Sequence, residues 1–537
     1  MTGGPARPRG QSLPGILLVL LTALSALGLA HAFPPHELSL LAWCCLSPFL
    51  FALRRAGMRQ AAGLGLLFGL LLGAGAFSWI NALQDFSLGS FLSSLLFFSL
   101  PFLAFGLLYR RAAAGGTSLL LVGPALWTAL EYARANLFFL ALPWNLLGHT
   151  QFRQLYVIQI VDWSGVYGVS FLLMIVNESL SRLPEAVCGR SSADADAAPA
   201  RALPAAAVLV VVLSVVLTFA YGQWRLTSPG PERSLRVALV QADVVPGDFM
   251  PKDDQVRHLD IYERLTREAA ASRPALIVWP ASSLPAPFYS NKPVRAAVAR
   301  IAREAHAFLL VGGAGQDKGA PHREGFLPFS NTEFLIAPSG RPVAKYDKIR
   351  LLPFNEYLPL QSWVHWPQWL TTLERSFVPG EERTVFEAGG ARFSAPICWE
   401  NLFPDHVRRF VLGGAQFIVS VTNEAFFGAC GAPYQTLAMN IFRAVENRVA
   451  VVRASPTGIS AFIGPDGDIQ ERVHDPDGRD LFVSGVLVRD VPLASSTTFY
   501  TRHGDIFAQA VAAVALLGTL SASRAPRGAD VTERGAS

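Results

Sequence analysis

The stretch ARFSAPICWENLFPDHVRRFVLGGAQFIVSVTN, residues 391–423, switches between two periodicities. A short apolar run ends at Cys398, residues 402–412 have helical spacing, and a second apolar run covers 415–423. Short β-branched runs that flank a helical segment are typical of strands covered on at least one face. The stretch therefore predicts a strand, a helix and a second strand of an α/β domain, with a cysteine at the end of the first strand.

The same alternation continues on both sides of this stretch. Further predicted strands are SLRVALVQADV (234–244), ALIVWPA (275–281), AFLLVGGAG (307–315), NTEFLIAP (331–338), RVAVVRAS (448–455) and LFVSGVLV (481–488). Residues 253–272, 291–306 and 433–446 have helical spacing. We therefore expect one α/β sandwich within residues 223–502.

The composition of the whole chain is that of a membrane protein. Hydrophobic residues make up 51% of the 537 residues and charged residues only 16%, against roughly 25% charged in soluble globular proteins. The net charge of +5 comes without a basic run interleaved with aromatic residues, so nucleic-acid binding is not expected. The five cysteines have no metal-ligand spacing, which argues against a zinc site or a disulfide framework.

Eight apolar segments come close to the length of about 20 residues that a spanning helix needs. They are residues 14–33, 36–53, 60–82, 88–109, 117–136, 165–181, 203–222 and 503–521. By the positive-inside rule the arginine-bearing loops are cytoplasmic; these contain Arg54, Arg55, Arg59, Arg110, Arg111, Arg182, Arg190 and Arg201. We therefore expect seven helices in 1–222, an extracytoplasmic domain at 223–502, an eighth helix at 503–521 and a cytoplasmic tail at 522–537. The first segment also resembles a signal peptide that is cleaved after Ala32, although its length favours a retained helix.

Two segments of the sandwich contain candidates for chemistry. A thiol at the turn after Cys398 would face backbone N–H groups and a helix N-terminus, which favour the thiolate. In KYDKIRLLPFNEYLP, residues 345–359, Lys348 and Glu356 flank an apolar turn. A lysine near a thiolate stabilises it and the tetrahedral oxyanion, and a carboxylate positions the lysine or transfers protons. Taken separately, each segment has a simpler interpretation: Cys398 would be a buried structural residue, and Lys348 and Glu356 would belong to a solvated loop.

Tryptophans mark two possible contacts with lipid. Trp363, Trp366 and Trp369 lie three residues apart in 358–373, which fits either a helical core stripe or a mobile lid at the membrane interface. In the loop 131–164, Trp144 and Trp163 are interpreted as anchors at the lipid headgroups.

The motifs together resemble one family. They are GVYGVSF (165–171) with Asn177, VWP (278–280), KYDKIRLLPFNEYLP (345–359), ICWE (397–400), TNEAFFG (422–428) and FRAVENRVAVVRASPTGIS (442–460). With the eight-segment layout, they resemble the bacterial apolipoprotein N-acyltransferases, membrane members of the nitrilase superfamily. The resemblance covers nearly the whole chain and implies a nitrilase-like αββα sandwich.

The resemblance also implies a catalytic set of glutamate, lysine and cysteine. The lysine corresponds to Lys348 and the nucleophile to Cys398, while Glu356 and Glu400 match accessory acidic positions. The family's glutamate follows a Trp-Pro pair, where this chain has Ala281. Alanine accepts no proton, so the expected general base is missing. Three explanations are open: an introduced inactivating substitution, which the intact flanking motifs favour, a natural pseudoenzyme, or recruitment of another carboxylate such as Glu356.

For a competent member, the resemblance implies a two-step acyl transfer in the bacterial inner membrane, on its periplasmic side. Cys398 is expected to take an acyl chain from a phospholipid, phosphatidylethanolamine, and to pass it to the α-amine of a diacylglyceryl-cysteine on an apolipoprotein. No metal or cofactor is implied, and nothing indicates an assembly beyond a monomer. The alternatives are a membrane-anchored amidase that gives its thioester to water, and a lipoprotein-binding protein without catalysis.

Overall fold

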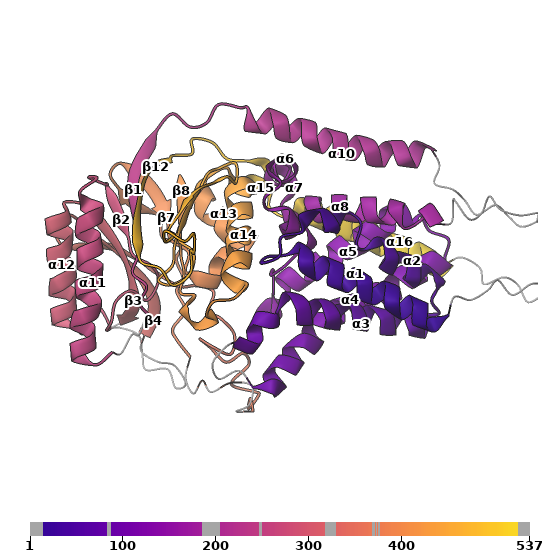
Figure 1. Ribbon diagram of the computed structural model, residues 1–537, viewed down its shortest axis with the longest axis horizontal. Helices are drawn as coiled ribbons and strands as arrows, with labels where there is room; N and C mark the ends of the chain where they lie inside the picture. The colour runs from indigo at the N-terminus through magenta and orange to yellow at the C-terminus, as the bar shows by residue number, and fades with distance from the viewer. Residues whose placement is uncertain are drawn as a thin grey trace, which may run out of the picture.

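The structure, a computed structural model, describes residues 14–82, 87–184, 205–245, 250–316, 329–367, 371, 373 and 376–524. It has two parts, an apolar bundle of helices and a sandwich of β-sheets with helices on both outer faces (Figure 1). The chain builds most of the bundle first, then the sandwich, and returns to the bundle with its last helix. The predicted combination of a part made of apolar helices and an α/β part is confirmed.

The described residues of the sandwich form two six-stranded sheets. The strands are β1 Ser234–Gln241, β2 Leu276–Val278, β3 Phe308–Gln316, β4 Phe329–Ile336, β5 Pro342–Asp347, β6 Phe386–Ala388, β7 Ala391–Ser394, β8 Phe417–Val421, β9 Ala450–Ala454, β10 Ala461–Ile463, β11 Ile469–Arg472 and β12 Gly485–Pro492. Their order is β12-β1-β2-β3-β4-β5 in one sheet and β11-β10-β9-β8-β7-β6 in the other. In each sheet three central strands are parallel and the outer neighbours are antiparallel.

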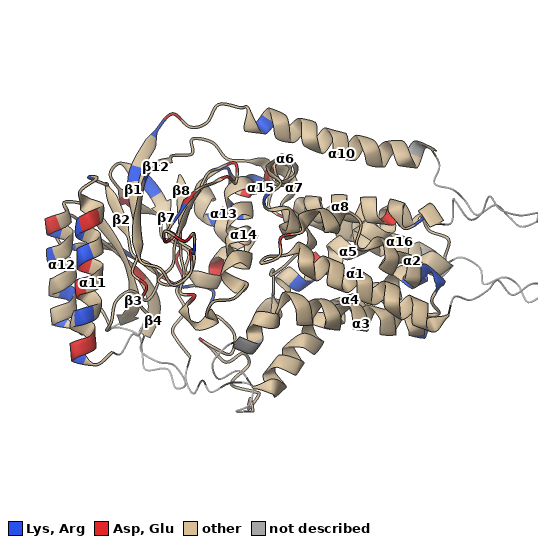
Figure 2. Cartoon of the chain, in the orientation of Figure 1, with Lys and Arg blue, Asp and Glu red and all other residues tan. Residues whose placement is uncertain are grey.

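Helices fill the connections between the parallel strands, as parallel pairing requires. They are α11 Lys252–Ala270, α12 Lys292–Ala305, α13 Pro404–Leu412 and α14 Ala432–Asn447. The first two cover the outer face of the first sheet, and the other two lie between the second sheet and the bundle (Figure 1). Charged residues are dense on α11 and α12, at the end of the molecule farthest from the bundle (Figure 2). The predicted αββα layering is present.

Every strand and helix predicted within the sandwich occurs in the structure. Strands β5, β6, β10 and β11 were not predicted. Two of them have only three residues each, β6 and β10, and β11, IQER, is mostly polar. Runs this short or this polar carry too few apolar positions for a periodicity.

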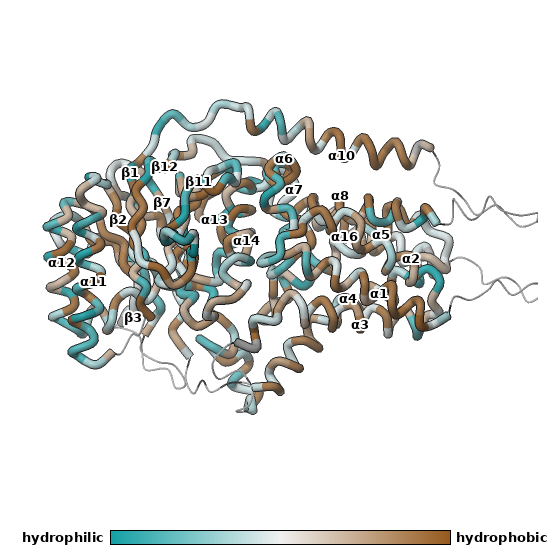
Figure 3. The backbone as a smooth tube through the Cα atoms, viewed as in Figure 1, coloured by the Kyte–Doolittle hydropathy of each residue, from teal (hydrophilic) through white to brown (hydrophobic). Residues whose placement is uncertain are grey.

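The bundle is made of apolar helices (Figure 3). Its longer elements are α1 Gly15–Ala32, α2 Ser47–Arg55, α3 Met58–Ala76, α4 Leu88–Ala114, α5 Leu119–Asn136, α8 Val166–Leu180, α10 Ala205–Leu226 and α16 Ile506–Arg524. The short ones are η1 Ser39–Trp43, η2 Ser78–Ala82, η3 Phe138–Leu140, η4 Leu147–Gln151, α6 Leu155–Ile158, α7 Val161–Ser164 and α15 Phe499–His503. Among the described residues, four helices are long and apolar enough to cross a membrane, or five if one pair bent by 120° at residues 155–180 counts as a span.

Of the eight predicted spans, 36–53, 117–136 and 503–521 are not among these helices, and the first of them is also broken. Segment 36–53 is divided into the 3₁₀ helix η1 and the nine-residue helix α2. Pro48 lies in the first turn of α2, where its missing N–H is tolerated, so a new helix begins there. An average of hydropathy over a sequence window shows that this segment is apolar, but it does not show that the segment forms two separate helices.

A buried amide joins the sandwich to the bundle. Gln435 of α14 accepts hydrogen bonds from Trp79 Nε1 at 3.1 Å and Trp144 Nε1 at 2.8 Å, and it donates to the backbone carbonyls of Pro34 and Ala76. The interpretation of Trp144 as a headgroup anchor is therefore wrong, because its indole is buried at this junction. Trp163, by contrast, is exposed.

Candidate active site

Cys398 occupies the turn that follows β7. It starts the short 3₁₀ helix η5, Cys398–Leu402, and its own φ is +55°. This left-handed conformation costs a residue with a β-carbon about 1–2 kcal/mol. The preceding residue, Ile397, forms a bridge to Val421 of β8, so the sheet fixes the turn. The predicted strand-end cysteine is in place, although the α-helix after it begins only at Pro404.

Lys348 lies just after β5 and is almost fully buried, with 1% of its surface exposed. Its Nζ is 2.8 Å from Glu356 Oε1 and 2.7 Å from Glu356 Oε2. Burial by itself lowers the pKa of Lys348, but the Glu356 carboxylate and the charge on Cys398 outweigh this effect and raise the pKa. Lys348 is therefore a buried cation close enough to Cys398 to interact with it electrostatically.

Glu356 is itself held from several sides. Besides Lys348, it accepts hydrogen bonds from the Leu352 backbone N–H at 2.7 Å and from Asn331 Nδ2 at 3.2 Å. Both of its oxygens are thus occupied. The predicted pairing of Lys348 with Glu356 across the apolar turn is present, and the reading of these charges as a solvated loop is wrong.

Glu400 connects the lysine segment to the cysteine turn. One oxygen accepts the backbone N–H groups of Ile349 and Arg350, and the other accepts that of Ile397. Tyr346 adds its hydroxyl at 2.9 Å. Burial raises the pKa of this carboxyl, but His406 and the backbone donors outweigh burial and lower it. Glu400 stays ionised and fixes Lys348 relative to Cys398.

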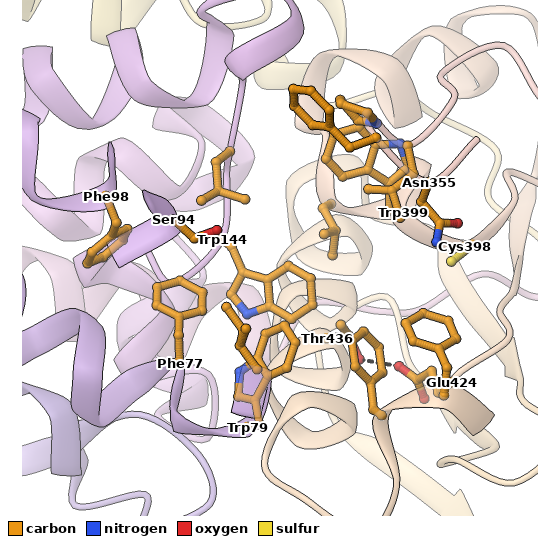
Figure 4. A pocket seen from close by; sticks show the side chains of 18 of the residues that line it. Phe77, Trp79, Ser94, Phe98, Trp144, Asn355, Cys398, Trp399, Glu424 and Thr436 are labelled. Carbon is orange, nitrogen blue, oxygen red and sulfur yellow. Dashed lines mark hydrogen bonds between the residues drawn. The ribbon is translucent and has the colours of Figure 1, made fainter. Parts of the chain in front are cut away.

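The thiol opens into an apolar cavity of about 520 Å³ between the bundle and the sandwich. Figure 4 shows Cys398, Trp399 and Asn355 on the sandwich side, and Phe77, Trp79, Phe98 and Trp144 on the bundle side. Ser94 of α4 faces the same space (Figure 4). A cavity of this size and lining suits an apolar ligand with a few polar anchor points.

Other residues of the cavity wall were not predicted as site residues. Glu424 has one oxygen 2.5 Å from Arg453 and 2.5 Å from Thr436, while its second oxygen has no partner among the described residues. Asn355 lies beside Cys398 (Figure 4). Both stand within quoted motifs, TNEAFFG and LLPFNEYLP, but only the fold places them next to the thiol.

Comparison with known proteins identifies the relatives of the chain. The family model "Apolipoprotein N-acyltransferase N-terminal domain" matches residues 25–178, and the model "Carbon-nitrogen hydrolase" matches residues 236–499. An apolipoprotein N-acyltransferase of Geobacter metallireducens is 35% identical over 515 residues, which are 94% of this chain and 95% of the relative. The chain belongs to the apolipoprotein N-acyltransferase family.

A second member of the apolipoprotein N-acyltransferase family, from Chlorobaculum tepidum, is 31% identical over 522 residues, covering 90% of this chain and 93% of that one. Among solved structures, a mutant amidase of the nitrilase superfamily from Nesterenkonia AN1 is 20% identical, with a TM-score of 0.37, and covers 53% of this chain and 96% of its own. Family membership confirms the predicted acyltransferase activity class and a membrane protein.

Ala281 departs from the apolipoprotein N-acyltransferase pattern that the sequence led us to expect. It is buried, three residues after the end of β2, in the hydrophobic core that also contains Tyr346 and Ile397. It therefore lies between the two sheets, and its methyl group offers no proton acceptor.

The tryptophan segment does not form a helical core stripe. Trp363 is 83% exposed and residues 364–367 have no helical structure, so that interpretation is wrong. Trp366 donates to the Pro359 carbonyl at 2.6 Å and packs edge-on against Phe354, a residue of the cavity wall. Trp369 lies outside the described residues. On the bundle side, the cavity beside Cys398 is lined by aromatic residues, and the expected contact of the tryptophan segment with lipid stays a prediction.

Proposed function

We propose that the protein transfers an acyl chain from a membrane phospholipid to the α-amine of a diacylglyceryl-cysteine on an apolipoprotein, through a thioester on Cys398. The observation that carries the proposal is that a candidate nucleophile and an apolar cavity lie next to each other. Cys398 lies at the sandwich end of a cavity whose other walls are apolar helices, and the buried ammonium of Lys348 interacts electrostatically with its thiol. An acyl chain reaches a nucleophile there without leaving an apolar environment.

In the first step, the sulfur of Cys398 attacks the ester carbonyl carbon, and the carbonyl oxygen becomes an oxyanion that Lys348 stabilises. Collapse breaks the ester C–O bond, leaves the acyl thioester and releases a lysophospholipid that takes up a proton. In the second step, the α-amine attacks the thioester and the thiol regains its proton. Glu356 and Glu400 are positioning residues. They hold Lys348 and the segment around it in place and do not touch the reacting atoms.

The donor and acceptor follow from the same cavity and from the family. Phosphatidylethanolamine is the proposed donor. Glu424, in the cavity wall, is paired with Arg453 but has one oxygen free to accept a hydrogen bond from the amine of the acceptor. The exposed Trp363 remains a proposed contact with lipid, together with Trp366 and Trp369. We propose that the protein works as a monomer.

We also propose eight spans, with the sandwich on the periplasmic side of the bacterial inner membrane. Support comes from the arginines of the loops. Arg54 donates to the carbonyl of Ser181 and pairs with Glu178 at 3.5 Å, and Arg110 donates to the carbonyl of Ala56. The C-terminal ends of α2, α4 and α8 therefore gather at one end of the bundle, and Figure 2 shows the basic residues of α2 at the end away from the sandwich. The positive-inside rule makes this end cytoplasmic.

The test is acyl transfer by the full chain in detergent, beside an Ala281→Glu version, with phosphatidylethanolamine and a diacylated lipopeptide. Intact mass spectrometry of both protein and peptide is expected to show one acyl chain on the enzyme and then one on the peptide. Release of fatty acid with an unchanged peptide from both versions would indicate an amidase. Retention of the lipopeptide without any acylation would indicate a binding protein, and either result would overturn the proposal.

Narrowing the cavity is expected to change the preference for acyl-chain length. Ser94→Phe places a ring in the space that Ser94 faces, so long chains lose room while short chains still fit. We expect kcat/KM for a palmitoyl donor to fall by about tenfold or more, and that for an octanoyl donor to fall less. Ser93→Phe, on the exposed side of the same helix, is the matched control. Equal losses for both donors would show that the acyl chain binds elsewhere.

A further inference from the structure

A buried carboxylate that the reaction scheme does not use lies beside Ala281. Glu333 is in the middle of β4 and is 0% exposed. It pairs with Gly312 of β3 on one side and with Tyr346 of β5 on the other. Side chains alternate along a strand, so Glu333 shares a face with Leu335, which belongs to the core between the two sheets. Its carboxylate therefore points into the layer that contains the site.

Gly312 makes room for this carboxylate. A β-carbon on Gly312 would overlap Glu333 Oε1, and the same β-carbon would lie 2.8 Å from the Cα of Ala281. The Glu333 carboxylate and Ala281 therefore both lie next to Gly312, which has no side chain to separate them. A carboxylate that reaches in from β4 stands next to the point from which a side chain at position 281 would start.

The hydrogen bonding of Glu333 differs from that of its neighbours. Neither of its oxygens has a hydrogen-bond partner among the described residues, whereas Glu356 and Glu400 have both oxygens occupied. A buried carboxylate without a partner is costly. Such a group is rarely kept for stability, and its two free oxygens are available for a proton.

We propose that Glu333 is the proton acceptor for Cys398, in place of the acidic residue that is absent at position 281. This inference rests on the proposed acyl transfer, and it selects recruitment of another carboxylate among the three explanations for Ala281, with Glu333 rather than Glu356 as the recruited residue. Ala281 is then the small residue that gives the recruited carboxylate its space.

The proton balance is that of a general base that turns into a general acid. Glu333 takes the thiol proton of Cys398 as sulfur bonds to the ester carbon, and it returns this proton to the lysophospholipid oxygen as the C–O bond breaks. In the second half-reaction it takes a proton from the attacking amine and gives one to the departing sulfur. No other reactant is needed.

Burial raises the pKa of Glu333 well above its usual range. The titratable groups beside it are Tyr262 of α11, whose pKa its charge helps to raise, and Tyr346, its pairing partner on β5, whose hydroxyl donates to Glu400. A general base is active when it is deprotonated. The reaction rate should therefore rise with pH, and it should do so at a higher pH than it would with a glutamate of ordinary pKa. The folded state is favoured while Glu333 is protonated, and this contribution is lost as the pH rises through the raised pKa.

The experiment compares the chain with Glu333→Gln, with Glu333→Ala combined with Ala281→Glu, and with Glu387→Gln. The assay is thioester formation from phosphatidylethanolamine followed by intact mass. Glu333→Gln should lower the rate by about 10²–10³-fold, and the double variant, which returns the carboxylate to position 281, should recover most of it. Glu387→Gln, an exposed carboxylate on β6, should change nothing.

Unfolding temperature separates a proton-transfer role from a structural one. Because Glu333 is buried without partners, Glu333→Gln should unfold at the same or a higher temperature than the chain, with a difference that grows from pH 6 to pH 9. A structural role predicts the reverse. An unchanged rate in Glu333→Gln would overturn the inference. The inference also fails if the original chain is inactive and the single substitution Ala281→Glu activates it. In either case the proposed function still stands. If all versions are inactive, the proposed function itself fails.

Discussion

Cys398→Ala is expected to abolish both the acyl-enzyme and the transfer to lipopeptide, with a loss of roughly 10⁴-fold or more. The thiol is the group that forms a covalent bond with the acyl chain, and alanine leaves nothing to form it. Alanine meets the same cost at φ +55° as cysteine does, so the fold should survive. The measurement is the intact mass of the enzyme after incubation with phosphatidylethanolamine, together with the yield of acylated lipopeptide.

Cys430 supplies the matched control. It lies in the loop before α14 and is partly buried, and burial raises the pKa of its thiol. Cys430 therefore remains a neutral thiol, which is a poor nucleophile. Cys430→Ala should retain the thioester and the transfer. The assignment of the nucleophile would be refuted if Cys430→Ala lost the thioester and Cys398→Ala kept it.

Much of the sandwich could be predicted because its periodicities are strong. Each predicted apolar run overlaps a strand, although β12 covers only the second half of 481–488, and the helical spacing of 253–272 and 433–446 corresponds to α11 and α14. The bundle was less predictable. A hydropathy window finds apolar segments, but it detects neither the break before α2 nor the depth at which Trp144 is buried.

The site shows the same division between local and long-range information. Lys348 and Glu356 are eight residues apart on one turn, so their pairing follows from local sequence. The bonds of Glu400 to the backbone of Ile349 and Arg350 cross from one sheet to the other, and no local pattern announces them. Glu333 offered one signal, a charged residue within the apolar strand NTEFLIAP, but its meaning depends on its pairing with Gly312.

The bundle-side cavity wall also gives the membrane part a specific role. If the helices only anchored the sandwich, the residues next to Cys398 would all come from the sandwich. Instead, Phe77, Trp79, Phe98 and Trp144 enclose the space in front of the thiol (Figure 4), and Gln435 ties the two parts together at that point. The bundle is therefore part of the cavity wall, and under the proposed acyl transfer a sandwich without the bundle would lack that side of the wall.

Lys348→Met is expected to slow thioester formation by about 10²–10³-fold, because the developing oxyanion loses its cation in a buried site. Methionine keeps most of the volume and removes the charge. Lys345→Met is the matched control in the same segment, since Lys345 is only partly buried and pairs with Asp347 at 2.6 Å; its rate should stay within about twofold, as expected for a surface ion pair.

Lys348→Met also leaves the buried Glu356 carboxylate without its cation, which costs about 3–5 kcal/mol of folding stability. A low rate in this variant therefore has two sources: the loss of the catalytic cation, and a smaller fraction of folded protein. The double variant Lys348→Met with Glu356→Gln separates them, because the neutral amide no longer needs a cation and the unfolding temperature should recover. If Lys348 acts on the oxyanion, the rate stays low in the recovered protein. If the rate returns together with the stability, Lys348 only holds the fold, and the oxyanion must be stabilised by backbone N–H groups alone.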